Sequence, residues 1–139
     1  MALSASASCA RKPKPGREPR VSIVKAASYD QSLYEKVRRL LGEHKVQALG
    51  KRVVLKPNLV EFDPATAINT HPLLVHAALE AFRALGASEV RIAEGPGHRR
   101  ATLDLAEAAG YFSTIPRFES LFTDFNLDEV TRVTWRAIS

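Results

Sequence analysis

The sequence predicts an α/β domain with a mostly parallel sheet and helices on both faces, and three observations support this class. Short runs rich in β-branched residues alternate with longer segments of helical periodicity. The run over residues 53–55 is continuously apolar, which is typical of a strand covered on both sides. Strands that alternate with helices need crossover connections, and such connections make neighbouring strands parallel.

The first third of the chain predicts a strand, a helix and a second strand. Residues 20–25 form a short β-branched run and predict the first strand. Ser28 and Gln31 have the spacing of a capping box, which predicts a helix that ends at Gly42. Residues 52–56 predict the second strand.

The next helix has clear signals at both ends. Pro57 closes the preceding strand because it has no backbone donor for a sheet ladder. After a long polar loop, Thr70 or His71 can cap a helix whose first turn contains Pro72, where a missing N–H costs little. Gly86 predicts the end of this helix.

The remaining elements are predicted less sharply towards the end of the chain. Residues 89–93 predict a third strand, and a shorter helix is expected over 102–109. Weaker patterns predict further strands at 121–126 and 130–135. Because the sequence stops soon after a strand-like run, the domain looks truncated at its C-terminus, and we expect the natural protein to continue.

Composition and charge divide the chain into two parts. Its 139 residues, 45% hydrophobic and 25% charged, suit one globular domain, which we place at residues 21–139. Residues 1–20 carry five basic side chains and one acidic one, so they account for +4 of the net charge of +5. We expect them to be a disordered basic tail or the remnant of a secretion signal. The folded part has no basic bias, so nucleic acid is not an expected partner.

Cysteine content and hydropathy exclude several classes of protein. Cys9 is the single cysteine, so the chain cannot form an intramolecular disulfide or hold a cysteine-based zinc or iron–sulfur centre alone. No apolar run approaches the ~20 residues of a membrane helix, so no transmembrane segment is expected. Localisation stays open: the chain as given is expected in the cytoplasm, and export is expected if the true start lies upstream.

Polar residues gather where two predicted strands end. Ligands of open parallel sheets bind beyond the carboxyl ends of the strands, where loops and helix N-termini converge. The candidates at this edge are Lys56, Asn58, Thr70, His71, Glu94, Gly95 and Gly97.

Each candidate also has a structural interpretation. Lys56 could hold an anionic ligand or act in acid–base or Schiff-base chemistry, or it could simply pair with Glu94. Asn58 could donate to a ligand or stabilise a turn. His71 could be an acid, a base or a ligand, but its position before a helical proline favours a role as helix cap. Thr70 is likewise interpreted first as a capping residue.

The glycines after the third strand give a weak phosphate-loop signal. Gly95 and Gly97 would let backbone N–H groups approach an anion, but the third glycine of G-x-G-x-x-G would fall at Arg100. The commoner interpretation of the neighbouring Arg99 and Arg100 is a solvated basic loop.

Residues 50–97 resemble the bacterial and archaeal family catalogued as domain of unknown function 362. The resemblance is carried by Lys56-Pro57-Asn58, Thr70-His71-Pro72, Gly86-Ala87 and the Glu94-Gly95-Pro96-Gly97 loop. It implies an α/β domain that is sometimes fused to a ferredoxin-like iron–sulfur module and sometimes exported by the twin-arginine route. It implies no settled reaction. The family domain extends past the end of this chain, and the cysteine-rich module is absent, so no cofactor is assigned.

The resulting hypothesis is a redox-linked enzyme whose N-terminal part binds a small anionic or metal-linked ligand between Lys56, Asn58 and the loop after the third strand. Lys56, His71 and Glu94 are the catalytic candidates, Asn58, Thr70, Gly95 and Gly97 are the ligand-binding candidates, and no residue is assigned to a metal. One alternative is a non-catalytic accessory domain that docks a redox partner protein. Another is a fragment without independent function, with an open sheet edge prone to association.

Overall fold

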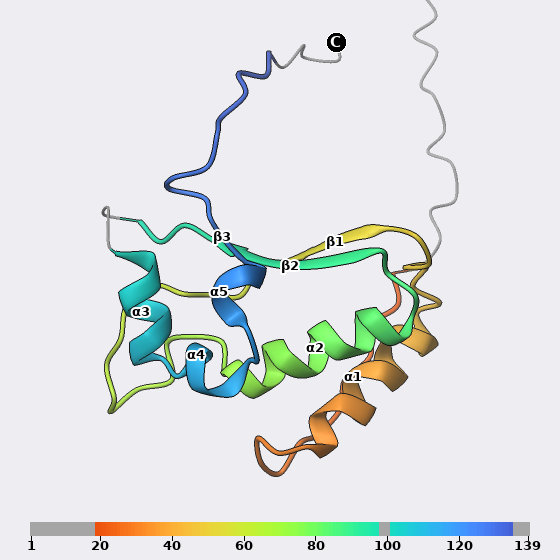
Figure 1. The fold of residues 1–139 in the computed structure, drawn as a ribbon. Helices are drawn as coiled ribbons and strands as arrows, with labels where there is room; N and C mark the ends of the chain where they lie inside the picture. Colours follow the sequence, from red (N-terminus) through yellow and green to blue (C-terminus); the bar gives the residue numbers. More distant parts are fainter. Residues whose placement is uncertain (1–18, 98–100, 135–139) are drawn as a thin grey trace, which may run out of the picture.

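A parallel sheet forms one layer of the computed structural model, which describes residues 19–97 and 101–134 (Figure 1). Within these residues the sheet contains β1 (Arg52–Leu55), β2 (Glu89–Glu94) and β3 (Phe122–Asp124), in the order β1-β2-β3. β1 and β3 each pair with β2 in parallel. The carboxyl ends of the strands therefore lie at the same edge of the sheet.

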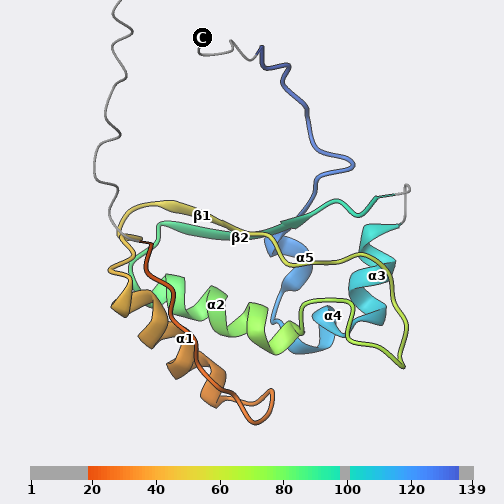
Figure 2. The same ribbon diagram turned by 180° about the vertical axis from the view of Figure 1, so that it is seen from behind.

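The helices form a second layer beneath the sheet. They are α1 (Ser32–Glu43), α2 (Pro72–Ala84), α3 (Thr102–Ala108), α4 (Tyr111–Thr114) and α5 (Phe118–Leu121). α2 packs against β1 and β2, α5 contacts β2, and α1 lies against the outer side of α2. The α/β class with a parallel sheet is confirmed. In the part of the chain that the structure describes, Figures 1 and 2 place the helices on one face, whereas the prediction put helices on both.

The hydrophobic core lies between the two layers. Ile92 of β2 and Leu79 of α2 are almost completely buried, as is Phe118, whose ring packs edge-on against that of Tyr111 at 5.4 Å. Burial of an Ile, Leu or Phe side chain contributes about 1.5–3 kcal/mol each. This core fixes α4 and α5 against β2, close to the carboxyl ends of the strands.

Two predicted strands are wrong. Residues 20–25 have no sheet partner, and Val21 and Ile23 are 81% and 92% exposed. Residues 130–134 are likewise outside the sheet, and Val133 is 65% exposed, while residue 135 lies outside the described residues. Both segments have β-branched composition, but neither meets a sheet edge that could accept its hydrogen bonds, so propensity alone does not make them strands.

The capping box predicted for the first helix is also wrong. Gln31 occupies the N-cap position without a side-chain bond, and the Asp30 carboxylate accepts the Ser32 N–H at 2.8 Å instead. The Ser28 hydroxyl donates to the same carboxylate. Hydrogen bonds from Ser28 and Ser32 lower the pKa of Asp30 to about 2. The carboxylate of Asp30, two residues after Ser28, thus replaces the expected Ser–Gln pair.

The other predicted elements are found near their expected bounds. Strands occupy most of 52–56 and 89–93 and the centre of 121–126, and helices begin at Pro72 and Thr102. No helix in the described ranges is long and apolar enough to cross a membrane. The tail predicted for residues 1–20 lies outside the described residues except for its last two positions.

Gly86 and Gly42 provide a matched test of the helix ends. Gly86 has φ +79°, and an added Cβ would lie 2.6 Å from the Leu49 side chain, whereas Gly42 lies inside α1 with open space around it. Gly86→Ala should lower the free energy of unfolding by about 1–2 kcal/mol, because L side chains disfavour the left-handed region. Gly42→Ala should raise it by about 0.5–1 kcal/mol through helix propensity. Urea unfolding measures both, and a stabilising Gly86→Ala would contradict the assigned helix end.

Candidate functional site

An ion pair joins the carboxyl ends of β1 and β2. Lys56 follows β1 directly, and its Nζ lies 2.5 Å from Oε2 of Glu94, the last residue of β2. The Glu94 side chain is 7% exposed, while that of Lys56 is 61% exposed. The structure therefore contains the ion pair that the sequence offered as the structural interpretation of Lys56. A buried carboxylate holds an ammonium group that still reaches solvent.

Glu94 is held from a second direction by the backbone. Its Oε1 accepts the N–H of Gly95 at 3.0 Å. A carboxylate accepts several hydrogen bonds, and a buried one needs them because removal from water is costly. An ammonium group has three donors, so Lys56 can bind Glu94 and still donate to a ligand. The pair thus fixes a partly exposed ammonium group at the carboxyl ends of the strands.

Tyr111 supports this edge from below, and sequence reasoning did not select it. It is fully buried at the start of α4, and its hydroxyl donates to the backbone oxygen of Thr70 at 2.6 Å. Burial, and then the negative charge of Glu94, raise the pKa of the Tyr111 phenol above its ordinary value. The phenol therefore stays protonated and keeps the start of α2 in place. The one sequence signal for Tyr111 is its position directly after the helix-ending Gly110.

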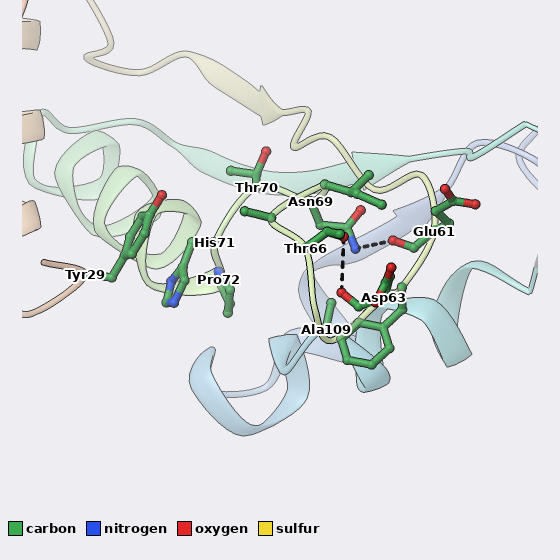
Figure 3. Close-up of a pocket in the computed structure, with 12 residues that line it drawn as sticks. Tyr29, Glu61, Asp63, Thr66, Asn69, Thr70, His71, Pro72 and Ala109 are labelled. Atoms are coloured by element: carbon green, nitrogen blue, oxygen red, sulfur yellow. Dashed lines mark hydrogen bonds between the residues drawn. The ribbon is translucent and has the colours of Figure 1, made fainter.

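The long loop between β1 and α2 is closed by its own polar residues. The N–H of Asn58 donates to Oγ1 of Thr70 at 2.9 Å, and the N–H of Thr70 donates to the backbone oxygen of Asn58 at 2.9 Å. The Asn58 amide also donates to the backbone oxygen of Ile68 at 3.0 Å. Asn69 accepts the N–H of Val60 through Oδ1 at 2.9 Å. Its amide donates to the backbone oxygen of Glu61 at 2.8 Å (Figure 3). Asn58 and Thr70 therefore shape the loop, and Thr70 is not the helix cap.

His71 is the cap of α2. Its Nδ1 accepts the N–H of Leu73 at 3.2 Å, so in the neutral ring the proton is on Nε2. The ring stacks on that of Tyr29, with centroids 3.9 Å apart and planes 7° from parallel (Figure 3). This matches the structural interpretation offered for His71. The ring is part of the wall where the N-terminal segment meets α2.

Three of the candidate residues, Lys56, Thr70 and His71, line two separate hollows. One, of about 180 Å³, is lined by Lys56 and Thr70 with Leu55, Pro57, Leu74, Val75 and Ala78. The other, of about 190 Å³, lies between the polar loop and the Tyr29–His71 stack (Figure 3). Thr70 borders both, but His71 borders only the second. The ion pair brings Lys56 and Glu94 together, whereas His71 borders the other hollow.

The two glycines of the loop after β2 differ in their surroundings. A Cβ on Gly95 would lie 2.9 Å from Cβ of Phe125, and Asn126 donates to the backbone oxygen of Pro96 at 3.0 Å. A side chain at Gly95 would therefore clash with the chain after β3, which crosses closely over this position. A Cβ on Gly97 would meet no atom. Arg99 and Arg100 lie outside the described residues.

Comparison with known families identifies the domain that contains these residues. The family model described as "Domain of unknown function (DUF362)" matches residues 53–138. The chain belongs to the DUF362 family. The match begins within β1 and includes Lys56, the polar loop, α2 and Glu94, so the candidate edge lies inside the DUF362 domain. No curated protein and no solved structure matches the chain.

The carboxyl ends of β1 and β2 in this DUF362 domain present an ammonium–carboxylate pair. In the described ranges, no group of three or more His, Cys, Asp or Glu side chains is arranged to hold a metal ion. The arrangement offers hydrogen-bond donors from Lys56 beside an apolar hollow. Such an arrangement offers a charged donor to an anionic group.

Two substitutions at one position test the cap. His71→Ala removes both the acceptor and the stack on Tyr29, whereas His71→Asn removes the stack but keeps a capping acceptor. We expect His71→Ala to be less stable than His71→Asn by about 1 kcal/mol, the usual contribution of a helix cap. Thermal or urea unfolding gives the difference. Equal stability of the two variants would show that the Nδ1 bond to Leu73 contributes nothing.

Proposed function

We propose that this DUF362 domain binds a small anionic ligand at the carboxyl-end edge of β1 and β2, with the ammonium group of Lys56 as the main contact. The observation that carries the proposal is the Lys56–Glu94 pair. The carboxylate is buried and the ammonium is 61% exposed, so the protein fixes the position of a cation that solvent can reach.

The hollow beside Lys56 supports a ligand with a small apolar body. Leu55, Pro57 and Val75 contribute apolar surface, and the Thr70 hydroxyl and the Lys56 ammonium contribute the polar groups. Its volume of about 180 Å³ fits a short carboxylic acid or a small phosphate ester better than a nucleotide. The same contact would bind the anionic ligand of a metal complex, which keeps metal-linked ligands within the proposal.

We propose that the site works as part of a redox-linked enzyme. Lys56 and Glu94 are the catalytic candidates, because they are in direct contact where β1 and β2 end and the ammonium of Lys56 reaches solvent. His71 would join them only by releasing its bond from Leu73. Asn58, Thr70 and Gly95 contribute by shaping the edge, and Gly97 is left as a backbone donor with open space beside it.

An accessory, non-catalytic role is the second candidate, and one observation favours it. Val60 and Phe62 are 41% and 48% exposed on the polar loop. Exposed apolar and aromatic side chains beside charged groups are typical of protein docking surfaces. Under this alternative, the edge would contact a redox partner protein, and substitution of Phe62 rather than Lys56 would abolish the interaction.

Inorganic phosphate and acetate are suitable probes, and the strand itself supplies a matched control. Lys51 precedes β1 and Lys56 follows it, so the two lysines lie at opposite ends of the same strand. In ¹H–¹⁵N spectra of the full chain, we expect either anion to shift the amides of Lys56, Thr70 and Gly95. Lys56→Ala should weaken this binding about tenfold or more, because a charge-assisted hydrogen bond is lost. Lys51→Ala should leave it unchanged.

Two outcomes would contradict anion binding at Lys56. If Lys51→Ala and Lys56→Ala reduce the shifts equally, the anions interact with general surface charge and the edge is not a site. If neither anion shifts these amides, anion binding is wrong, and the docking alternative is tested with Phe62→Ser.

A further inference from the structure

Thr70 is held by hydrogen bonds at three of its polar atoms. Its backbone oxygen accepts the hydroxyl of Tyr111 at 2.6 Å, and its N–H donates to the backbone oxygen of Asn58 at 2.9 Å. Its Oγ1 accepts the N–H of Asn58 at 2.9 Å. A hydroxyl group can also donate one bond. Among the described residues the Thr70 hydroxyl accepts a bond without donating one, so its hydrogen is available to a ligand.

The Thr70 hydroxyl is the second polar group of the hollow beside Lys56. Both residues line this hollow of about 180 Å³. Glu94 holds the Lys56 ammonium, and Asn58 holds the Thr70 hydroxyl. The hollow therefore has two donors, one charged and one neutral, whose positions are restrained by other bonds. An oxyanion can accept from both, because its oxygens have several lone pairs in defined directions.

Tyr111 restrains Thr70 from α4. The Tyr111 ring is fully buried and packs edge-on against Phe118, with centroids 5.4 Å apart, which limits the movement of its hydroxyl. α4 packs against α2 and lies beside the start of that helix (Figures 1 and 2). Burial, and then the charge of Glu94, raise the pKa of Tyr111, so the phenol remains a donor. Tyr111 thus bonds to Thr70 and also interacts electrostatically with the carboxylate that holds Lys56.

We propose that Tyr111 is a positioning residue of the anion site and that, by fixing Thr70, it makes the site select oxyanions over halides. The inference rests on the anion binding at Lys56 proposed above. Tyr111 does not line the hollow, so it acts through the Thr70 backbone. The ligand class is a carboxylate or a phosphate, because both carry the oxygen acceptors that suit an ammonium and a hydroxyl together.

Selectivity follows from the different nature of the two donors. Lys56 attracts any small anion through its charge. The Thr70 hydroxyl contributes a directional bond, which favours an oxygen lone pair over a spherical halide. Loss of the Tyr111 bond should therefore weaken oxyanion binding more than chloride binding. A merely structural role of Tyr111 would change the affinity for both kinds of anion alike.

Titrations of the full chain with acetate, inorganic phosphate and chloride, followed by amide shifts at constant ionic strength, test the proposal. Tyr111→Phe removes one hydroxyl and keeps the ring. It should lower the ratio of oxyanion to chloride affinity about two- to tenfold, the range of one neutral hydrogen bond. Ser113→Ala is the matched control, since it removes a hydroxyl of the same helix that donates to the backbone oxygen of Gly110 at 3.1 Å. It should leave the ratio unchanged.

Two variants of Thr70 test the second donor, and they decide the matter if Tyr111→Phe does not fold. Thr70→Ser keeps the hydroxyl and should retain the affinity ratio. Thr70→Val removes the hydroxyl and should lower the ratio about two- to tenfold. A larger loss for acetate than for phosphate would identify a carboxylate ligand, and the reverse would identify a phosphate ester; either result supports the inference.

The outcomes also separate this inference from anion binding itself. If Lys56→Ala abolishes binding but a folded Tyr111→Phe keeps the wild-type ratio, the positioning role is wrong and the anion site stands. An unchanged ratio in Thr70→Val overturns the role of the hydroxyl in the same way. If no anion binds in a manner that depends on Lys56, the proposed function and this inference are both wrong.

Discussion

The structure at the site depends on the need to compensate a buried carboxylate. Glu94 ends the central strand, and its side chain is almost completely removed from water, which is costly for a charged group unless donors surround it. Two donors reach it, the ammonium of Lys56 and the N–H of Gly95. These two bonds tie the end of β1 and the turn after β2 to the same carboxylate, and Lys56 also borders the hollow beside them.

The sequence predicts the parts of this edge that follow from strand geometry. The sequence predicts that Lys56 and Glu94 lie close together. Each directly follows a predicted strand core, and parallel strands end on the same side of a sheet. The bond between Tyr111 and Thr70 could not be predicted in this way, because it joins residues 41 positions apart through the packing of α4. The stack of Tyr29 on His71 likewise joins residues far apart in the sequence, and it depends on how the chain before α1 packs beside the start of α2.

The wrong strands share one physical cause. β-branched runs favour extended backbone, but a strand exists only where a neighbouring edge accepts its hydrogen bonds. The described sheet stops at β1 on one side and at β3 on the other, and residues 20–25 and 130–134 reach neither edge. The same shortage of neighbours leaves one face of the sheet bare. In the described part of this DUF362 chain, helices therefore cover one face of the sheet, and the other face carries no helix (Figures 1 and 2).

A double-mutant cycle on Lys56 and Glu94 tests the central claim most directly. The free energy of unfolding is measured for the wild type, Lys56→Met, Glu94→Gln and the double variant. If the buried carboxylate depends on the lysine, Lys56→Met alone should cost about 1–3 kcal/mol, because it leaves a buried charge without its partner. The double variant should then cost less than the sum of the two single variants by about 0.5 kcal/mol or more. Additive costs would contradict the account, since they would show that the two side chains act independently and that the pair does not organise the edge.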